Sequence, residues 1–262
     1  MGVLILDEVD STNTYVREHC GDLEDGTLVM ARRQTAGRGR RGRAWISPPG
    51  VNFTGSVLFK RLGDGFHAGC LLGVAALGAV RELAPELPVY LKWPNDLYIE
   101  DRKLAGILCE SARIEHGRIT AVAAGIGVNL NLTSDELRVI DQPATSLYAE
   151  TGSEFNPDFF SKKLAEQLNR YYIIYLNNAG FVIQKWIAAN LLAGESLTVI
   201  DPRGKAHTGI FRRIQEDGSM LFEEDGGIPL VFTCGDVKID RNSVDWSRLK
   251  QKAANHYKQP KE

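Results

Sequence analysis

A stretch rich in arginine and glycine, residues 37–45, carries the side chains of this chain best suited to binding or catalysis. Besides three glycines it contains four arginines and a tryptophan, namely Arg38, Arg40, Arg41, Arg43 and Trp45. Two guanidinium groups about 4 Å apart repel by roughly 4 kcal/mol at a protein surface, so such a cluster favours an anionic ligand. Glycine lets the backbone approach a ligand closely, and arginine donates paired hydrogen bonds to carboxylates and phosphates. The stretch therefore predicts an anion site, with a solvated basic turn as the alternative.

Three other stretches carry polar residues of types that suit a ligand pocket. Residues 11–13, Ser-Thr-Asn, precede a helical pattern, where capping the helix is the simplest role for a hydroxyl group. Residues 92–96, Lys-Trp-Pro-Asn-Asp, end in a turn in which Asp96 could merely bond the backbone. Residues 101–108 place Lys103 in a second turn, where an exposed lysine is the plain alternative to a functional one. For Trp45, the plain alternative to a role in ligand binding is a place in the hydrophobic core.

Composition describes a globular protein with a nearly balanced charge. The 262-residue chain has 44% hydrophobic residues, 24% charged residues and a net charge of −2, and it is long enough for a substantial core. Because the whole chain is near neutral, the arginines are a local concentration. That argues against a surface that binds nucleic acid throughout.

The cysteines are scattered along the chain, at Cys20, Cys70, Cys109 and Cys234. Without a Cys-x-x-Cys pair they indicate neither a zinc site nor a disulfide framework, so reduced thiols are expected. The five histidines show no metal-ligand spacing either. The N-terminus turns acidic too soon for a signal peptide, and no apolar stretch approaches the roughly 20 residues that span a bilayer. The sequence predicts a cytoplasmic protein.

Hydrophobic patterning predicts an α+β fold in which helices pack on a mixed, largely antiparallel sheet. Strands are expected at residues 4–9, 28–31, 51–59, 89–93, 97–100, 104–110 and 119–128. Helices are expected after Ser11, at residues 67–83, from Asn156 to Gly180, and at residues 182–192. The turns between the last four strands are short and require antiparallel neighbours. The helix at residues 67–83 is apolar nearly all round, so it is expected to be buried.

A second, smaller unit follows Gly194, where short strands alternate with turns rich in Asp, Gly and Pro. Its strands are expected at residues 197–200, 209–214, 220–223 and 237–239. The predicted organisation is a large domain over residues 1–192, a small β-domain over 193–240, and a polar, basic tail over 241–262. The tail is expected to be a loosely held helix or a disordered end.

Taken together and in this order, the polar stretches closely resemble the biotin–protein ligases. The resemblance rests on residues 11–13, on Gln34 with the arginine stretch, and on the motifs at 92–96 and 101–108. Residues 125–131, Gly-Ile-Gly-Val-Asn-Leu-Asn, also fit that family's pattern. The resemblance covers nearly the whole chain. It implies a class II synthetase-like biotin/lipoate ligase catalytic domain followed by a small SH3-like β-barrel.

The resemblance also implies a role for each matching position. The pocket for the ureido end of biotin would be lined by Ser11, Thr12, Asn13 and Gln34. The carboxylate of biotin, and later the adenylate phosphate, would be held by Arg38, Gly39, Arg40 and Lys103. The nucleotide would be bound by Arg40, Arg43, Trp45 and Asn129, with Phe232 as a further wall. The catalytic residues would be Lys103, Arg38, Arg40 and Asp96, the last of which would lie where the acceptor lysine arrives.

The implied reaction activates biotin with ATP to biotinyl-5'-AMP, releases pyrophosphate, and passes biotin to a lysine of a biotin carboxyl carrier protein. The residue types suit it, because a carboxylate and the ATP α-phosphate are both anions and fixed cations offset their repulsion. Mg²⁺ would neutralise the leaving pyrophosphate. Asp96 is the candidate base, since an ammonium group has no lone pair with which to attack. The glycines predict a loop that is mobile without ligand and closes over biotin to exclude water.

Some members of the family carry an N-terminal helix-turn-helix domain and repress transcription. Only ten residues precede Ser11 here, so a ligase without sequence-specific DNA binding is expected, and the family habit suggests a homodimer. A lipoate–protein ligase is the nearest alternative, although polar groups placed for a ureido ring would be left unpaired by the dithiolane of lipoate. A nucleic-acid-binding module is the remote alternative and would bind with a steep salt dependence.

Overall fold

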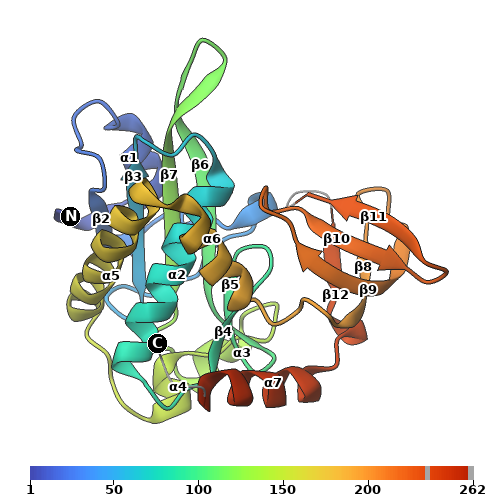
Figure 1. Cartoon of the computed structure of the whole chain (residues 1–262). Coiled ribbons are helices and arrows are strands. Elements are labelled where there is room, and N and C mark those ends of the chain that lie inside the picture. Colours follow the sequence, from blue (N-terminus) through green and yellow to red (C-terminus); the bar gives the residue numbers. More distant parts are fainter. Residues whose placement is uncertain (234–236, 259–262) are drawn as a thin grey trace.

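The computed structural model describes residues 1–233 and 237–258, apart from the side chains of residues 256–258. Its larger part is built on a seven-stranded sheet with the strand order β1-β2-β3-β7-β6-β5-β4 (Figure 1). In chain order the strands are β1 (Val3–Val9), β2 (Leu28–Gln34), β3 (Phe53–Phe59), β4 (Val89–Lys92), β5 (Asp96–Ile99), β6 (Arg102–Glu115) and β7 (Arg118–Val128). β1 and β2 pair in parallel and the other neighbours are antiparallel, which confirms the predicted mixed sheet.

Helices pack on both faces of this sheet. On one face lies α2 (Gly65–Leu83), on which α5 (Pro157–Asn177) and α6 (Ala179–Ala188) pack in turn (Figure 1). The other face is covered by α1 (Thr12–Glu18), which packs on β3, β6 and β7. Successive residues of a strand point to opposite faces. Accordingly Val57 belongs to the main core, whereas Leu58 packs with Val16 of α1.

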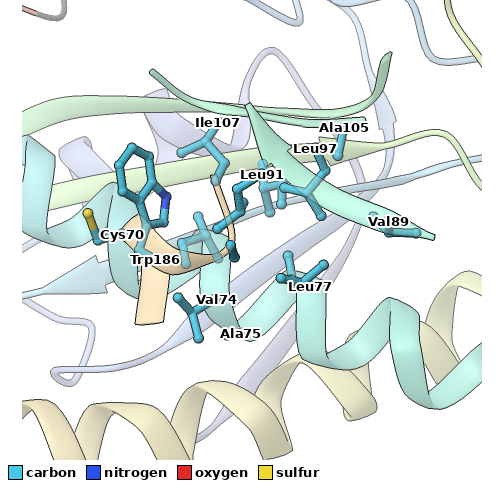
Figure 2. Packing of buried hydrophobic residues seen from close by; sticks show 14 of the residues in the cluster. Cys70, Val74, Ala75, Leu77, Val89, Leu91, Leu97, Ala105, Ile107 and Trp186 are labelled. Atoms are coloured by element: carbon cyan, nitrogen blue, oxygen red, sulfur yellow. The ribbon is translucent and has the colours of Figure 1, made fainter. Parts of the chain in front are cut away.

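The helix α2 is buried, as its apolar sequence predicts. It is long and apolar enough by composition to cross a membrane, so the expectation that no stretch would approach that length was wrong. In this fold, however, 61% of its apolar 18-residue stretch is buried within the protein. Figure 2 shows Cys70, Val74, Ala75 and Leu77 of α2 facing Val89, Leu91, Leu97, Ala105 and Ile107 of the sheet, with Trp186 of α6 closing the layer. The apolar surface of α2 therefore serves the core.

The helix α5 begins where the sequence places it. Asn156 caps it by accepting hydrogen bonds from the backbone N–H groups of Asp158 and Phe159. Its apolar residues recur at helical spacing and pack on the core. Three of them are fully buried and two tyrosines pack against the core: Phe160, Leu164, Leu168, Tyr171 and Tyr175.

The predicted end of this helix at Gly180 was wrong. α5 ends at Asn177, and the side chain of Asn178 accepts a hydrogen bond from the Phe181 N–H to cap α6, so Gly180 lies inside the next helix. An asparagine cap outweighs the helix-ending tendency of glycine here. Two short helices, α3 (Ser134–Arg138) and α4 (Leu147–Thr151), were not predicted.

The second unit is a five-stranded antiparallel sheet with the order β11-β10-β9-β8-β12. Its strands are β8 (Ser196–Ile200), β9 (Ala206–Ile214), β10 (Met220–Glu224), β11 (Ile228–Phe232) and β12 (Lys238–Asp240). The sequence predicted four of them and missed β11. Closure of the sheet into an SH3-like barrel and the domain boundaries at 192 and 240 stay predictions, and Cys234 lies outside the described residues.

The small sheet docks on the large one through the turn before β10. The indole Nε1–H of Trp93 donates to the carbonyl oxygen of Gly218 at 3.0 Å, and the ring of Phe66 lies where a side chain at Gly218 would stand. Phe66 in turn meets Trp186 edge-to-face. Trp93 is thus a core residue, and it joins the two units.

The basic tail is held more firmly than expected. It forms η2 (Arg241–Ser243) and α7 (Trp246–Lys258), in which Leu249 is fully buried. The Lys252 ammonium group donates to the carbonyl oxygens of Leu191 and Ala193 at 2.6 and 2.8 Å. These contacts fix α7 to the segment that links the two sheets, and Lys261 lies outside the described residues.

Candidate active site

A cleft of about 630 Å³ lies beside the arginine loop, which is defined here as residues 37–45 between β2 and β3. Side chains of both sheets, of α1 and of residues 139–144 line it. Twelve residues that the sequence proposed for the site lie in this lining: Ser11, Thr12, Asn13, Gln34, Arg38, Gly39, Arg40, Arg43, Trp45, Asp96, Lys103 and Asn129. Phe232, expected as a further wall, packs instead against Phe222 and His207 in the small sheet, so that expectation was wrong.

One part of the cleft is a cup of buried polar groups at the start of α1. The side chains of Ser11, Thr12, Asn13 and Ser56 are almost fully buried. Thr12 donates from both its N–H and its hydroxyl group to Gln34 Oε1, at 2.7 and 3.1 Å. Although Ser11 stands at the N-cap position, its side chain makes no capping hydrogen bond, so simple capping does not explain its hydroxyl group.

A glycine makes room for the cup on the neighbouring strand. A side chain at Gly125 on β7 would overlap the amide of Asn13, whose Oδ1 lies 2.7 Å from the hydroxyl oxygen of Ser56. The Asn13 Nδ2 donates to the carbonyl oxygen of Leu108 at 3.0 Å and to Glu110 Oε2 at 2.8 Å. Both partners are acceptors, so the amide must present its NH₂ to them and its oxygen to the cup.

The arginine loop folds back on itself as a compact turn. The Gly39 N–H donates to the carbonyl oxygen of Arg43 at 2.7 Å, and the Trp45 N–H to that of Gly37 at 3.0 Å. Arg41 has a φ of 59° and Gly42 a φ of 73°, the left-handed region in which glycine carries no penalty. This backbone shape directs several arginines into one cleft, and one of them, Arg40, donates to Asn95 Oδ1 at 3.0 Å.

Lys103, expected to hold the biotin carboxylate, and Asp96, the candidate base, form an ion pair. Lys103 Nζ lies 2.8 Å from Asp96 Oδ1, and both side chains are largely buried, with 15% and 13% of their surface exposed. The pair bridges β5 and β6 at the edge of the cleft. The same ammonium group lies 5.9 Å from the centre of the Trp45 ring. An incoming anion would therefore compete with Asp96 for Lys103.

Asn129 has a structural partner within the site. Its side chain is buried, and Nδ2 donates to the carbonyl oxygen of Thr145 at 3.0 Å. This bond ties the end of β7 to the segment that follows α3. The indole Nε1 of Trp45, by contrast, is buried without a hydrogen-bond partner among the described residues. A buried unpaired donor in a cleft indicates a place for a ligand acceptor.

Lys92 is a cleft residue to which the sequence assigned no role, although it opens the Lys-Trp-Pro-Asn-Asp motif. Among the described residues its Nζ makes no ion pair, and it lies 5.1 Å from the centre of the Tyr98 ring. Burial lowers the pKa of Lys92 to about 8; the charge of Asp96 opposes the shift and that of Lys103 adds to it. A fraction of Lys92 is therefore neutral near physiological pH.

Two more wall residues come from the tail. Arg241 pairs with Asp101 at 2.7 Å and stacks on the Trp246 ring, and Trp246 stacks in parallel on Tyr98. Both line the cleft. No motif marks them, because they lie about 140 residues from the sheet residues that they meet, and only the fold brings them there.

Comparison with known proteins gives consistent matches. Residues 5–129 match the biotin/lipoate A/B protein ligase family. The biotin–[acetyl-CoA-carboxylase] ligase of Paracoccus denitrificans is 35% identical over 231 residues, which cover 85% of this chain and 95% of that protein. The bifunctional ligase/repressor BirA of Escherichia coli is 34% identical over 230 residues, covering 86% of this chain and 70% of that protein. A solved structure, biotin protein ligase from Aquifex aeolicus in complex with biotin and ATP, has a TM-score of 0.76 and 27% identity over 92% of this chain and 99% of that one.

Proposed function

The chain belongs to the biotin/lipoate A/B protein ligase family, and we propose how its cleft joins biotin to a protein lysine in two steps, the first of which consumes ATP. The protein is a biotin–protein ligase. The observation that carries the assignment of residues is that one cleft combines a buried cup of hydroxyl and amide groups with a set of fixed cations. A ureido ring offers N–H donors and a carbonyl acceptor to the cup, and the carboxylate of the same molecule meets the cations.

In the first step an oxygen of the biotin carboxylate attacks the α-phosphorus of ATP, and the bond to the bridging oxygen of the β-phosphate breaks. Arg38, Arg40 and Lys103 offset the repulsion between the two anions and stabilise the charge that develops in transfer. Trp45 contacts the adenine, and Arg43 and Asn129 lie near the nucleotide. Among the described residues, no group of three acidic, His or Cys side chains could hold a metal ion. In this proposal Mg²⁺ would enter with the ATP phosphates and neutralise the charge of the pyrophosphate.

In the second step the amine of the acceptor lysine attacks the biotinyl carbonyl, AMP leaves, and the amine gives up a proton. Asp96 is the base in this proposal. Its ion pair with Lys103 suits the order of events, because an acyl phosphate that draws Lys103 away leaves the carboxylate free to accept that proton.

The acceptor in this proposal is a biotin carboxyl carrier protein of a carboxylase, and the enzyme is cytoplasmic. A homodimer and the absence of sequence-specific DNA binding stay predictions. Sedimentation of the pure protein with and without biotin and ATP tests the first, and binding to a panel of DNA duplexes tests the second.

The decisive experiment is ATP–pyrophosphate exchange by the pure protein with biotin, with lipoate and with neither, because it needs no carrier. Exchange is expected with biotin alone, and Lys103→Ala and Arg38→Ala should abolish it. Exchange with lipoate instead would keep the fold and the adenylate chemistry but contradict the assignment of the cup. No exchange with either acid would contradict the assignment of the whole site.

A further inference from the structure

Glu110 on β6 joins the two parts of the site that the proposed function assigns to opposite ends of biotin. Its Oε2 accepts a hydrogen bond from the Asn13 side chain at 2.8 Å and from Arg38 Nη2 at 3.3 Å. Its Oε1 lies 3.5 Å from the guanidinium groups of both Arg38 and Arg17. About a quarter of the Glu110 side chain is exposed, and the residue does not line the cleft itself. It therefore contacts cleft residues from behind.

The contact fixes how Arg38 faces the cleft. Every hydrogen bond of the Arg38 guanidinium to the described residues uses Nη2, which donates to Glu110 and to the Thr14 hydroxyl group at 3.2 Å. A guanidinium group is a rigid planar fork, so holding one nitrogen sets the direction of the others. Nε and Nη1 are left for a ligand carboxylate.

The same carboxylate fixes how Asn13 faces the cup. With Glu110 and the Leu108 carbonyl oxygen both accepting from Nδ2, the amide oxygen points toward Ser56 and Gly125. An amide that turned over would place its oxygen against a carboxylate, and the two acceptors would repel. Glu110 thus keeps an acceptor in the cup, where a ureido N–H needs one.

We propose that Glu110 is a positioning residue for biotin: it orients Asn13 toward the ureido end and Arg38 toward the carboxylate without touching the substrate itself. The inference rests on the proposed function for those two residues. A purely structural role would use the ion pair between Glu110 and Arg17, which ties α1 to β6. That pair is 3.5 Å long and 43% of the Arg17 side chain is exposed, so its contribution to stability is small.

Glu110→Gln tests the proposal with little change of shape. Biotin binding, measured by calorimetry, is expected to weaken about tenfold, whereas the KM for ATP stays within about twofold and the melting temperature is nearly unchanged. Arg17→Ala is the matched control, because it removes the structural pair and leaves the contacts with Asn13 and Arg38; it should bind biotin as the wild type does.

Biotin amide, which has no carboxylate charge, separates the two effects. Its affinity depends less on Arg38, so the loss caused by Glu110→Gln should be smaller for the amide than for biotin. Wild-type affinity of Glu110→Gln for biotin would overturn the proposal, as would an equal loss for biotin and ATP together with a lower melting temperature. If the wild type itself fails in biotin-dependent pyrophosphate exchange, it is the proposed function that fails.

Discussion

The indole of Trp45 lies against Gly127 of β7, in the space that a side chain at position 127 would occupy. Gly106 of β6 is approached by the same ring, with Trp45 Cζ3 3.3 Å from the place of a Cβ. Gly106 and Gly127 are directly paired across the two strands. Two directly paired glycines thus leave a flat surface on the sheet. This surface sets the position of the Trp45 indole, which we propose contacts adenine.

Gly127→Ala should push this ring out of its seat. Overpacking of this kind costs about 1–3 kcal/mol. Here it is expected to displace Trp45, a loop residue, rather than to destabilise the core. The KM for ATP is expected to rise roughly tenfold, a change worth about 1.4 kcal/mol, with biotin affinity nearly unchanged. Steady-state kinetics and calorimetry measure the two.

The control for this change is Gly63→Ala, where the nearest atom to an added Cβ is the Ile119 carbonyl oxygen at 3.8 Å. It should leave the kinetics unaltered. An unchanged KM for ATP in Gly127→Ala would show that the indole does not contact the nucleotide.

Asp96→Asn separates the two half-reactions. The asparagine cannot accept the proton of the acceptor lysine, so transfer of biotin to a carrier domain is expected to slow by about 10²–10⁴-fold. Pyrophosphate exchange with biotin should persist, because the first step needs no proton transfer to residue 96. Single-turnover transfer from preformed adenylate measures the second step. Asp141→Asn, a second carboxylate in the cleft lining, is the control; equal slowing in both variants would contradict a specific role for Asp96.

Lys92 gives stability a pH dependence whose sign is set by its lowered pKa. Folding moves this pKa from 10.5 to about 8, so between these values the unfolded chain binds more protons and stability rises with pH. The penalty of a charged Lys92 is fully present below pH 8 and is worth up to roughly 3 kcal/mol, less where cleft water solvates it.

Lys92→Met removes this penalty. The variant should exceed the wild type in unfolding free energy at pH 7.5, and the difference should disappear by pH 10.5. Urea unfolding of both proteins at several pH values between 7.5 and 10.5 measures this difference. Titrating groups that the two proteins share contribute equally to both and cancel in the difference. A difference independent of pH would mean that packing, not charge, separates them.

The arginine loop should exchange its amide hydrogens faster without biotin than with it. The backbone hydrogen bonds of residues 37–45 join residues of the loop itself, and Arg38, Arg41 and Arg43 are exposed, so the protection of these amides depends on the loop keeping its own shape. Hydrogen exchange across residues 37–42 is expected to slow at least tenfold on adding biotin, while α2 serves as an unaffected reference. Equal protection of these amides with and without biotin would contradict a loop that closes over biotin.

Much of the fold followed from local patterns. Hydrophobic patterning marks the strands of the large sheet, and the capping residue Asn156 marks the start of α5. The strand β11 was missed because Gly226, Gly227 and Pro229 are typical of a turn, yet proline is tolerated at a sheet edge, where β11 lies. The five-residue helices α3 and α4 are too short for a helical period to be visible.

Predicting all residues of the site from the sequence was harder than predicting the fold. The residues of the cup and the arginine loop lie in motifs, so sequence alone brings them together. Glu110 lies just beyond a motif, and its partners are 72 to 97 residues away, so no local pattern marks it. Arg241 and Trp246 belong to a polar tail whose composition favours solvent, and only the packing of α7 turns them toward the cleft.

The position of Arg241 and Trp246 in the chain also bears on the order in which the walls of the cleft can form. A growing polypeptide leaves the ribosome from its N-terminus, so the seven-stranded sheet, the cup and the arginine loop can fold before residue 241 has been added. During that interval the cleft lacks its wall beside Lys92 and Tyr98, and any adenylate formed there would face water. The cleft gains this wall only once Arg241 and Trp246 have been synthesised, after the elements that hold the cup and the arginine loop.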